Sequence, residues 1–94
     1  MVKKKMIQKN ILKLIIKKVD NYLYDDITFD EFNRWFNPIA WTIEKQSDKL
    51  AMEMVYKLNT IMAEFTSDHR GEISMRSEME QIIEPYRRLN VLHN

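Results

Sequence analysis

Apolar residues recur at helical spacing in four stretches of this chain, and the first predicts a helix over residues 3–23. Its apolar positions follow the i, i+4, i+7 pattern of one buried face. They are Ile7, Ile11, Leu14, Ile15, Val19, Tyr22 and Leu23. Lysines recur every four residues beside this face, at Lys5, Lys9, Lys13 and Lys17. The pattern predicts an amphipathic helix with one basic side.

The second stretch, TFDEFNRWFNPIAWTIE at residues 28–44, begins with a helix-start signal. Thr28 and Glu31 have the spacing of a capping box, in which each side chain accepts a hydrogen bond from the other residue's amide. Phe29, Phe32 and Phe36 then fall on one helical face. We expect this aromatic cluster to be mainly core.

Pro38 lies in the middle of this stretch. Proline has no N–H and clashes with the carbonyl four residues back. Asn37 and Pro38 suit a cap followed by a first helical position. We therefore predict a helix that is kinked or split at Pro38, into residues 29–36 and 38–45.

Two further helices are predicted, at residues 48–66 and 75–84. Ser47 or Asp48 is the expected cap of the former. Its apolar face is formed by Leu50, Ala51, Met54, Val55, Leu58, Ile61, Met62 and Phe65, with Lys49, Glu53 and Lys57 outside. Gly71, the only glycine, is expected in a turn conformation closed to other residues. Ser74 is the expected cap of the last helix, and Pro85 is expected to end or kink it.

These elements predict an all-α fold, a compact antiparallel bundle of about four helices. One glycine and two prolines are too few for the turns of a β-sandwich or barrel. We expect a single domain over residues 1–94. It comprises a basic amphipathic helix at 1–23, an acidic helical body at 28–86 and a frayed tail at 87–94.

The candidate chemistry does not favour an enzyme. The chain has no cysteine, which excludes a disulfide framework, a thiolate zinc site and a cysteine nucleophile. The two histidines, His69 and His93, have no partners at metal-ligand spacing. Asp25 and Asp26 are adjacent acids in a polar connection, where carboxylates are usually just solvated. We predict no catalytic residue, no metal and no cofactor.

The N-terminus does not have the pattern of a secretory signal. Its apolar segment is interrupted by Lys13, Lys17 and Lys18. No apolar run reaches the ~18–20 residues of a membrane span. We expect a cytoplasmic protein that does not span a membrane.

The net charge of +1 conceals a strong asymmetry. Residues 1–20 carry seven lysines and one aspartate, whereas residues 25–84 carry thirteen carboxylates and six basic residues. Residues 25–84 therefore have a net charge of −7. A carboxylate surface that is not neutralised nearby attracts basic surfaces, above all those of proteins that handle nucleic acid.

Helix connections are the expected places for recognition residues. The acidic candidates for partner binding are Asp25, Asp26, Asp68 and Glu72. Two aromatic residues, Tyr24 and Trp41, complete the predicted set. Trp35 and Trp41 lie six residues apart and cannot share one helical face, so at least one tryptophan is expected to be partly exposed, as interface anchors often are.

Residues 27–86 resemble a family of small bacterial helical proteins, many of them immunity partners of polymorphic toxins, including those of contact-dependent growth inhibition. The resemblance lies in the runs ITFDEFNRWFNPIAWTIE, YKLNTIMAEFTSDHRG and EPYRRL. The matched residues are Phe29, Phe32, Trp35, Phe36, Pro38, Trp41, Glu44, Ala63, Glu64, Phe65, His69 and Gly71. It implies a cytoplasmic protein that binds one toxin domain as a one-to-one heterodimer. The toxin is typically a nuclease that cleaves tRNA or other RNA, and binding blocks its active site or substrate groove.

Two alternatives stay open. The lysine-rich first helix favours a small regulator that binds nucleic acid or a membrane surface. However, the lysine stripe contains no arginine and no interleaved aromatic residue, so it offers little for reading bases. Alternatively, the protein is a structural subunit that dimerises through this helix.

Overall fold

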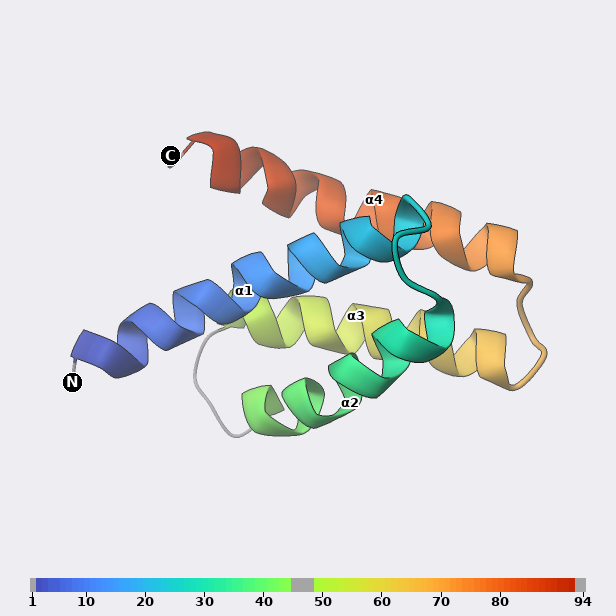
Figure 1. The fold of residues 1–94 in the computed structure, drawn as a ribbon, viewed down its shortest axis with the longest axis horizontal. Coiled ribbons are helices and arrows are strands. Elements are labelled where there is room, and N and C mark those ends of the chain that lie inside the picture. Colours follow the sequence, from blue (N-terminus) through green and yellow to red (C-terminus); the bar gives the residue numbers. More distant parts are fainter. Residues whose placement is uncertain (1, 45–48, 93–94) are drawn as a thin grey trace. The chain divides into compact units, whose positions relative to one another are not determined.

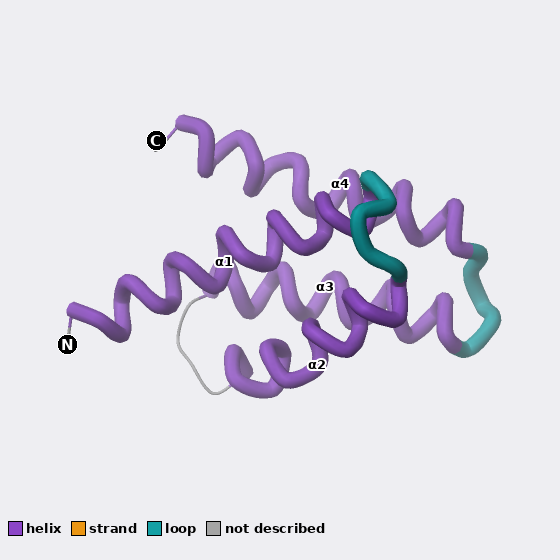
Figure 2. Tube along the Cα trace, viewed as in Figure 1, coloured by secondary structure: helices purple, strands orange, loops and turns teal. Residues whose placement is uncertain are grey.

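The computed structural model of the chain contains four α-helices, and no strand occurs among the residues it describes. The backbone is described for residues 2–44 and 49–92, and the side chains for residues 11–42 and 49–88. The helices are α1 (Val2–Leu23), α2 (Phe29–Glu44), α3 (Lys49–Thr66) and α4 (Glu72–Leu92), as Figure 1 shows. Short loops join α1 to α2 and α3 to α4 (Figure 2). The predicted all-α class is confirmed.

The chain divides into two compact units, Met1–Met52 and Glu53–Asn94. The first contains α1 and α2, and the second contains most of α3 and all of α4. The antiparallel bundle and the single domain expected from the sequence stay predictions.

The core of the first unit is aromatic where α1 meets α2. The ring of Tyr22 lies 5.8 Å from that of Phe29 and 6.0 Å from that of Phe32. Phe32 in turn stacks on Phe36 at 5.5 Å. Aromatic pairs at these separations add to the stabilisation from burial. The cluster is core, as the spacing predicts.

The buried face of α1 is rotated slightly from the predicted one. Ile15, Val19 and Tyr22 are fully buried, as expected. The prediction is wrong for Leu14, which is 44% exposed, while Ile16 is buried instead. Adjacent isoleucines and leucines leave the edge of an apolar stripe ambiguous to within one residue.

The capping box at the start of α2 is confirmed. The Thr28 amide donates to Glu31 Oε1 at 2.9 Å, and the Glu31 amide donates to Thr28 Oγ1 at 3.1 Å. Two of the amides that lack a helical partner at this end are thereby satisfied.

The predicted division of α2 at Pro38 is wrong, because the helix runs from Phe29 to Glu44 with Pro38 inside it. The helix is buried on both sides of the proline, at Phe32 and Phe36 before it and at Ala40 after it. Both halves therefore pack into the same core. Burying one phenylalanine contributes about 1.5–3 kcal/mol. That offsets the ~3 kcal/mol that proline costs a helix interior. A kink at Pro38 stays a prediction.

The second unit has a methionine-rich core. Its buried residues lie on one stripe of α3 and one stripe of α4: Met54, Val55, Leu58, Ile61, Met62, Met75, Met79, Ile83 and Tyr86. The hydroxyl of Tyr86 donates to Glu53 Oε1 at 2.8 Å, which ties α4 to α3. The predicted face of α3 is correct except at Leu50, which is 46% exposed, and at Phe65, which is only half-buried.

The start of α4 differs from the prediction. The helix begins at Glu72, and the Met75 amide donates to the Gly71 carbonyl at 3.0 Å, so Gly71 is the N-cap. Glycine is an acceptable N-cap residue. Gly71 does not have a positive φ, so the turn conformation predicted for it is wrong. Ser74 is not the cap, because it lies inside the helix. Its hydroxyl accepts a hydrogen bond from Arg70 Nη1 at 2.9 Å.

The end of α4 also differs. Pro85 does not end the helix, which continues to Leu92 through most of the predicted tail. Ile83 and Tyr86 are buried on either side of the proline. As in α2, buried residues on both sides of an exposed proline support an uninterrupted helix.

Some predictions fall outside the described residues. These are the cap at Ser47 or Asp48 and the side chains of Lys5, Ile7, Lys9, Ile43, Glu44 and His93.

Candidate functional site

The turn after α1, residues 24–28, carries three of the six predicted contact residues. Helix α1 ends in a pair of hydrogen bonds, from the Asp26 amide to the Asn21 carbonyl at 2.8 Å and from the Asp25 amide to the Tyr22 carbonyl at 3.0 Å. This is the Schellman pattern of helix ends, whose left-handed position usually holds glycine. Asp25 occupies that position, with φ 64°. The cap fixes the backbone that carries Tyr24 and Asp26.

The turn after α3, residues 67–71, repeats the same arrangement. The His69 amide donates to the Glu64 carbonyl at 2.8 Å, and the Asp68 amide donates to the Phe65 carbonyl at 3.2 Å. Asp68 takes the left-handed position, again with φ 64°. Two of the predicted contact residues therefore also terminate helices.

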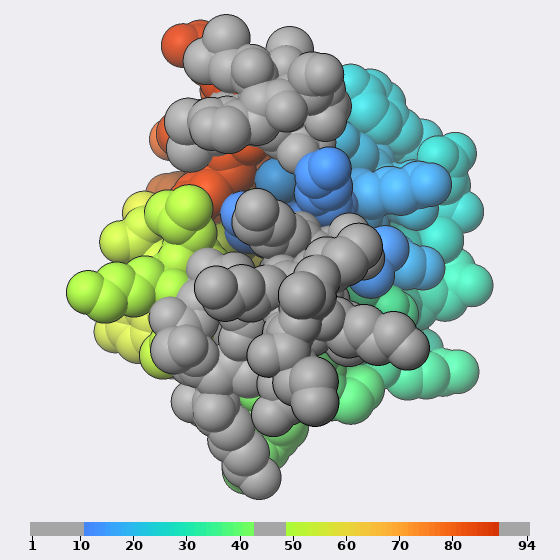
Figure 3. Space-filling model, turned by 90° about the vertical axis from the view of Figure 1, so that its left-hand side faces the viewer, coloured from blue at the N-terminus to red at the C-terminus, as the bar shows by residue number. Residues whose placement is uncertain are grey.

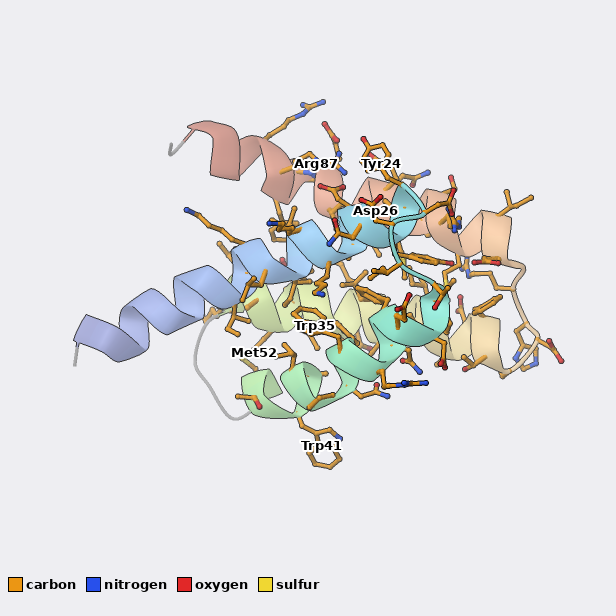
Figure 4. All side chains as sticks on the ribbon, viewed as in Figure 1. Tyr24, Asp26, Trp35, Trp41, Met52 and Arg87 are labelled. Carbon is orange, nitrogen blue, oxygen red and sulfur yellow. The ribbon has the colours of Figure 1, made fainter. Side chains whose placement is uncertain are left out.

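All six predicted contact residues are exposed. The two aromatic candidates, Tyr24 and Trp41, are 75% and 69% exposed. In Figure 4, Tyr24 and Asp26 lie at the turn after α1, and Trp41 points away from the far end of α2. At 1.5 Å per residue, Trp41 is about 18 Å along α2 from its start.

The six predicted contact residues are divided between the two units. Tyr24, Asp25, Asp26 and Trp41 belong to the first unit. Asp68 and Glu72 belong to the second. Within the first unit, the acidic turn and Trp41 are two separate contact points.

Trp35 is the less exposed of the two tryptophans. Its side chain is half-buried, and the Lys18 ammonium lies 5.6 Å from the ring centre. A cation in this position is attracted to the face of the indole. The expectation that at least one tryptophan is exposed is confirmed at Trp41, and one lysine of α1 is engaged within the unit.

Arginines neutralise much of the acidic body. Arg70 contacts Glu64 at 2.6 Å and Glu78 at 3.7 Å, and Arg76 contacts Glu72 at 3.6 Å. Glu72 is therefore a weaker candidate for attracting a partner than the sequence indicates.

The last part of α4 carries another ion-pair network. Arg87 contacts Glu80 at 2.8 Å and Glu84 at 2.6 Å, and Arg88 contacts Glu84 at 3.2 Å. The hydrogen bond from Arg87 lowers the pKa of Glu80 despite some desolvation. Among the described residues, no ion pair reaches Asp26 or Asp68, and both are exposed to solvent.

Of the exposed apolar side chains that the predicted site omits, Tyr56 and Ile73 are the most exposed among the described residues. Tyr56 on α3 is 74% exposed, and Ile73 in the first turn of α4 is 87% exposed. Tyr56 falls outside the apolar stripe of α3, so the helical period could have identified it. Ile73 could not be placed, because the predicted helix began after it.

His69, the histidine that the structure describes, lies in the turn after α3. The hydroxyl of Ser67 lies 2.9 Å from His69 Nδ1, and both residues are exposed in the turn after α3. Ser67 also donates to the Ala63 carbonyl at 2.8 Å, so its hydroxyl serves the helix end. No group of three or more acidic or histidine residues within the described ranges could hold a metal ion.

None of the helices, over their described residues, combines the length and apolar character needed to cross a membrane.

Comparison with known proteins adds no relative: no protein-family model, no curated protein and no solved structure matches this chain.

Proposed function

We propose that this protein is an immunity protein, a non-catalytic inhibitor that binds one cognate nuclease toxin in the cytoplasm. The observation that carries the proposal is the turn after α1. There the capped end of α1 presents the exposed Tyr24 two residues before Asp26, whose carboxylate no ion pair reaches among the described residues. An aromatic anchor next to fixed charge is a common composition for a protein contact.

The charge of this turn indicates the kind of partner. Nuclease clefts are basic because they bind phosphates, and a carboxylate surface is complementary to them. Asp68 adds a second exposed carboxylate on the other unit. Inhibition then needs no chemistry on this chain, only occupation of the cleft.

A neutral variant tests the electrostatic part of this proposal. The variant carries Asp25→Asn, Asp26→Asn, Asp68→Asn and Glu72→Gln. These substitutions keep the side-chain shapes, and asparagine also tolerates the left-handed backbone conformation at residues 25 and 68. We expect toxin binding at low salt to weaken more than tenfold, because charge complementarity controls the association rate. Titration calorimetry with the toxin domain recovered by affinity capture measures it.

A control variant with the same charge change separates local from overall electrostatics. It carries Asp30→Asn, Glu53→Gln, Glu80→Gln and Glu84→Gln. We expect this control to bind the toxin domain within about threefold of the wild type, because these carboxylates already have partners in the chain. Equal losses in both variants would show that only net charge matters.

A second candidate function rests on α1. Lys13 and Lys17 are exposed one turn apart, and the described part of α1 reaches the surface on the face shown in Figure 3. A nucleic-acid or membrane-surface regulator would use this side. Mobility-shift and liposome-sedimentation assays at ~50 mM and ~200 mM salt test it, because phosphate contacts are steeply salt-dependent. Absence of binding at the lower salt would eliminate it.

A further inference from the structure

The outward side of α3 carries a row of exposed, uncharged side chains. They follow the spacing i, i+4, i+7 and i+11: Tyr56, Thr60, Ala63 and Ser67. This is the spacing of the two inward positions in a coiled-coil heptad. Ser67 follows α3 directly, and its amide still donates to the Ala63 carbonyl at 3.0 Å, as in the helix. We call these four residues the outer seam.

The hydroxyl groups of the outer seam that belong to Thr60 and Ser67 are turned back to the helix itself. Thr60 Oγ1 donates to the Tyr56 carbonyl at 2.9 Å, and Ser67 Oγ donates to the Ala63 carbonyl at 2.8 Å. These donors are therefore satisfied without a partner outside the chain. A surface helix normally has charged residues on its outward side, whereas the outer seam has none. It has the character of a helix face that packs on another helix.

Two charged residues, Lys57 and Glu64, flank the outer seam on one side, seven residues apart. Lys57 is exposed and takes part in no ion pair among the described residues. Glu53, one turn before it, accepts instead from Tyr86. Arg70 contacts Glu64 through Oε1, at 2.6 Å and 2.8 Å, so Oε2 can accept from a second cation.

We propose that the outer seam binds the outer seam of a second copy of this chain, as an antiparallel two-fold pair. Between helices that run in opposite directions, the heptad positions place Tyr56 against the partner's Ser67 and Thr60 against the partner's Ala63. The largest side chain of the seam then faces a small one, and the small residues let the two backbones approach closely.

The flanking charges fit this antiparallel arrangement. In an antiparallel pair the same flank of each helix meets its counterpart, so Lys57 lies beside the partner's Glu64, and Glu64 beside the partner's Lys57. In a parallel pair this flank would meet the opposite one, which carries only uncharged residues, Met52, Asn59 and Thr66. Charge complementarity therefore favours a second copy in the antiparallel orientation.

The expected dimer is weak. The outer seam extends over about 16 Å of helix, which is short for a protein interface. Dimerisation should therefore depend on protein concentration. The inference goes beyond the proposed function and does not depend on it, because Tyr24 and Asp26 lie outside the outer seam.

Sedimentation velocity of the full chain tests the pairing, at protein concentrations from roughly 10 μM to 1 mM. We expect the wild type to shift from monomer to dimer across this range. Tyr56→Ala should weaken the dimer at least about fivefold, because Tyr56 is the one large side chain of the outer seam. The matched control is Tyr24→Ala, which removes a tyrosine of similar exposure, 75% against 74%, and should dimerise as the wild type does.

Two charge variants test the orientation. Lys57→Glu places like charges at both flanking contacts and should weaken the dimer about tenfold. Adding Glu64→Lys restores opposite charges and should recover most of the affinity, provided that the melting temperature of the double variant shows it folded, since Glu64 also binds Arg70.

Four outcomes would overturn the inference. They are a wild type that stays monomeric at the highest concentration, a dimer that Tyr56→Ala does not weaken, a dimer that Tyr24→Ala weakens equally, and a dimer that Lys57→Glu leaves unchanged. The proposed function is judged separately, by capture of a toxin. The neutral variant that tests it retains Tyr56, Lys57 and Glu64, so either proposal can fail while the other holds.

Discussion

Asp25 and Asp68 occupy the same backbone conformation at the ends of two different helices. Each has φ 64°, and each donates its amide to a carbonyl three residues back. Glycine is the usual residue there, because a side chain with a Cβ costs roughly 1–2 kcal/mol in the left-handed region. Both aspartates are exposed, so packing does not explain them. Aspartates that lower stability at these two positions support the proposed role in binding a partner.

Replacing either aspartate with glycine should therefore stabilise the fold. We expect Asp25→Gly and Asp68→Gly each to raise the free energy of unfolding by about 0.5–1 kcal/mol, after allowing for the greater flexibility of glycine in the unfolded chain. Urea denaturation monitored by circular dichroism measures this change. Asp26→Gly is the control and should not stabilise, because Asp26 does not have a positive φ. Loss of stability in both test variants would contradict this account.

Tyr86 should make stability sensitive to high pH. Burial, with the hydrogen bond to Glu53 and the charge of that carboxylate, raises the pKa of Tyr86 to about 12. The folded state thus retains the phenolic proton more tightly than the unfolded state. The contribution is fully present below the ordinary tyrosine pKa near 10 and is lost as the pH rises toward 12.

The phenolate absorbance of the folded protein measures this titration directly. We expect Tyr86 to ionise near pH 12. The Tyr86→Phe variant should lack the late transition and should lose less stability between pH 10 and 12. If the late transition persists in Tyr86→Phe, the assignment of the raised pKa to Tyr86 is wrong.

At the scale of the elements, the sequence predicts the four helices and most of their buried faces. Local signals suffice where one cause dominates, as at the Thr28 and Glu31 capping box. Local signals fail at Pro38 and Pro85, because by the local rule a proline breaks a helix. In both helices, buried residues on either side of the proline stabilise the continuous helix. A single-sequence pattern does not contain that tertiary contribution.

The candidate site is predictable to a smaller extent. Acidic residues in connections and an exposed tryptophan follow from spacing alone, and the structure exposes all six predicted contact residues. The ion pair that weakens Glu72 depends on the early start of α4, which the sequence does not reveal. The position of Trp41 on the same helix as the aromatic core depends on α2 continuing through Pro38, contrary to the local rule.

The two internal prolines lead to a prediction about stability. Pro38→Ala and Pro85→Ala should each raise the free energy of unfolding, by up to about 3 kcal/mol, because each restores a helical amide donor. Thermal unfolding followed by circular dichroism reports the increase. A fall in melting temperature for either variant would mean that the surrounding residues have adapted to the proline.

At the scale of the whole molecule, the sequence predicts one domain and the structure gives two compact units. Both tryptophans lie in the unit Met1–Met52, whereas all four helices contribute to the circular dichroism signal. If the units fold as one domain, tryptophan fluorescence and circular dichroism should follow the same urea transition. Two separated midpoints would contradict the single domain.

The charge pattern also belongs to the whole molecule. The net charge of +1 arises from a lysine-rich α1 and an acidic remainder, and arginine pairs reduce the latter to a few exposed carboxylates. Asp26 and Asp68 are two of the exposed carboxylates that no ion pair reaches among the described residues. These two carboxylates support the proposed binding of a basic protein.

Affinity capture from lysate of the organism that encodes the protein tests this central claim most directly. The tagged wild type and the four-residue neutral variant are compared at low and high salt, and retained proteins are identified by mass spectrometry. We predict that the wild type retains one stoichiometric nuclease with a basic surface, that this nuclease is inhibited in the complex, and that the neutral variant retains much less of it. Equal retention by both proteins, or retention of nucleic acid in place of a protein, would contradict the account.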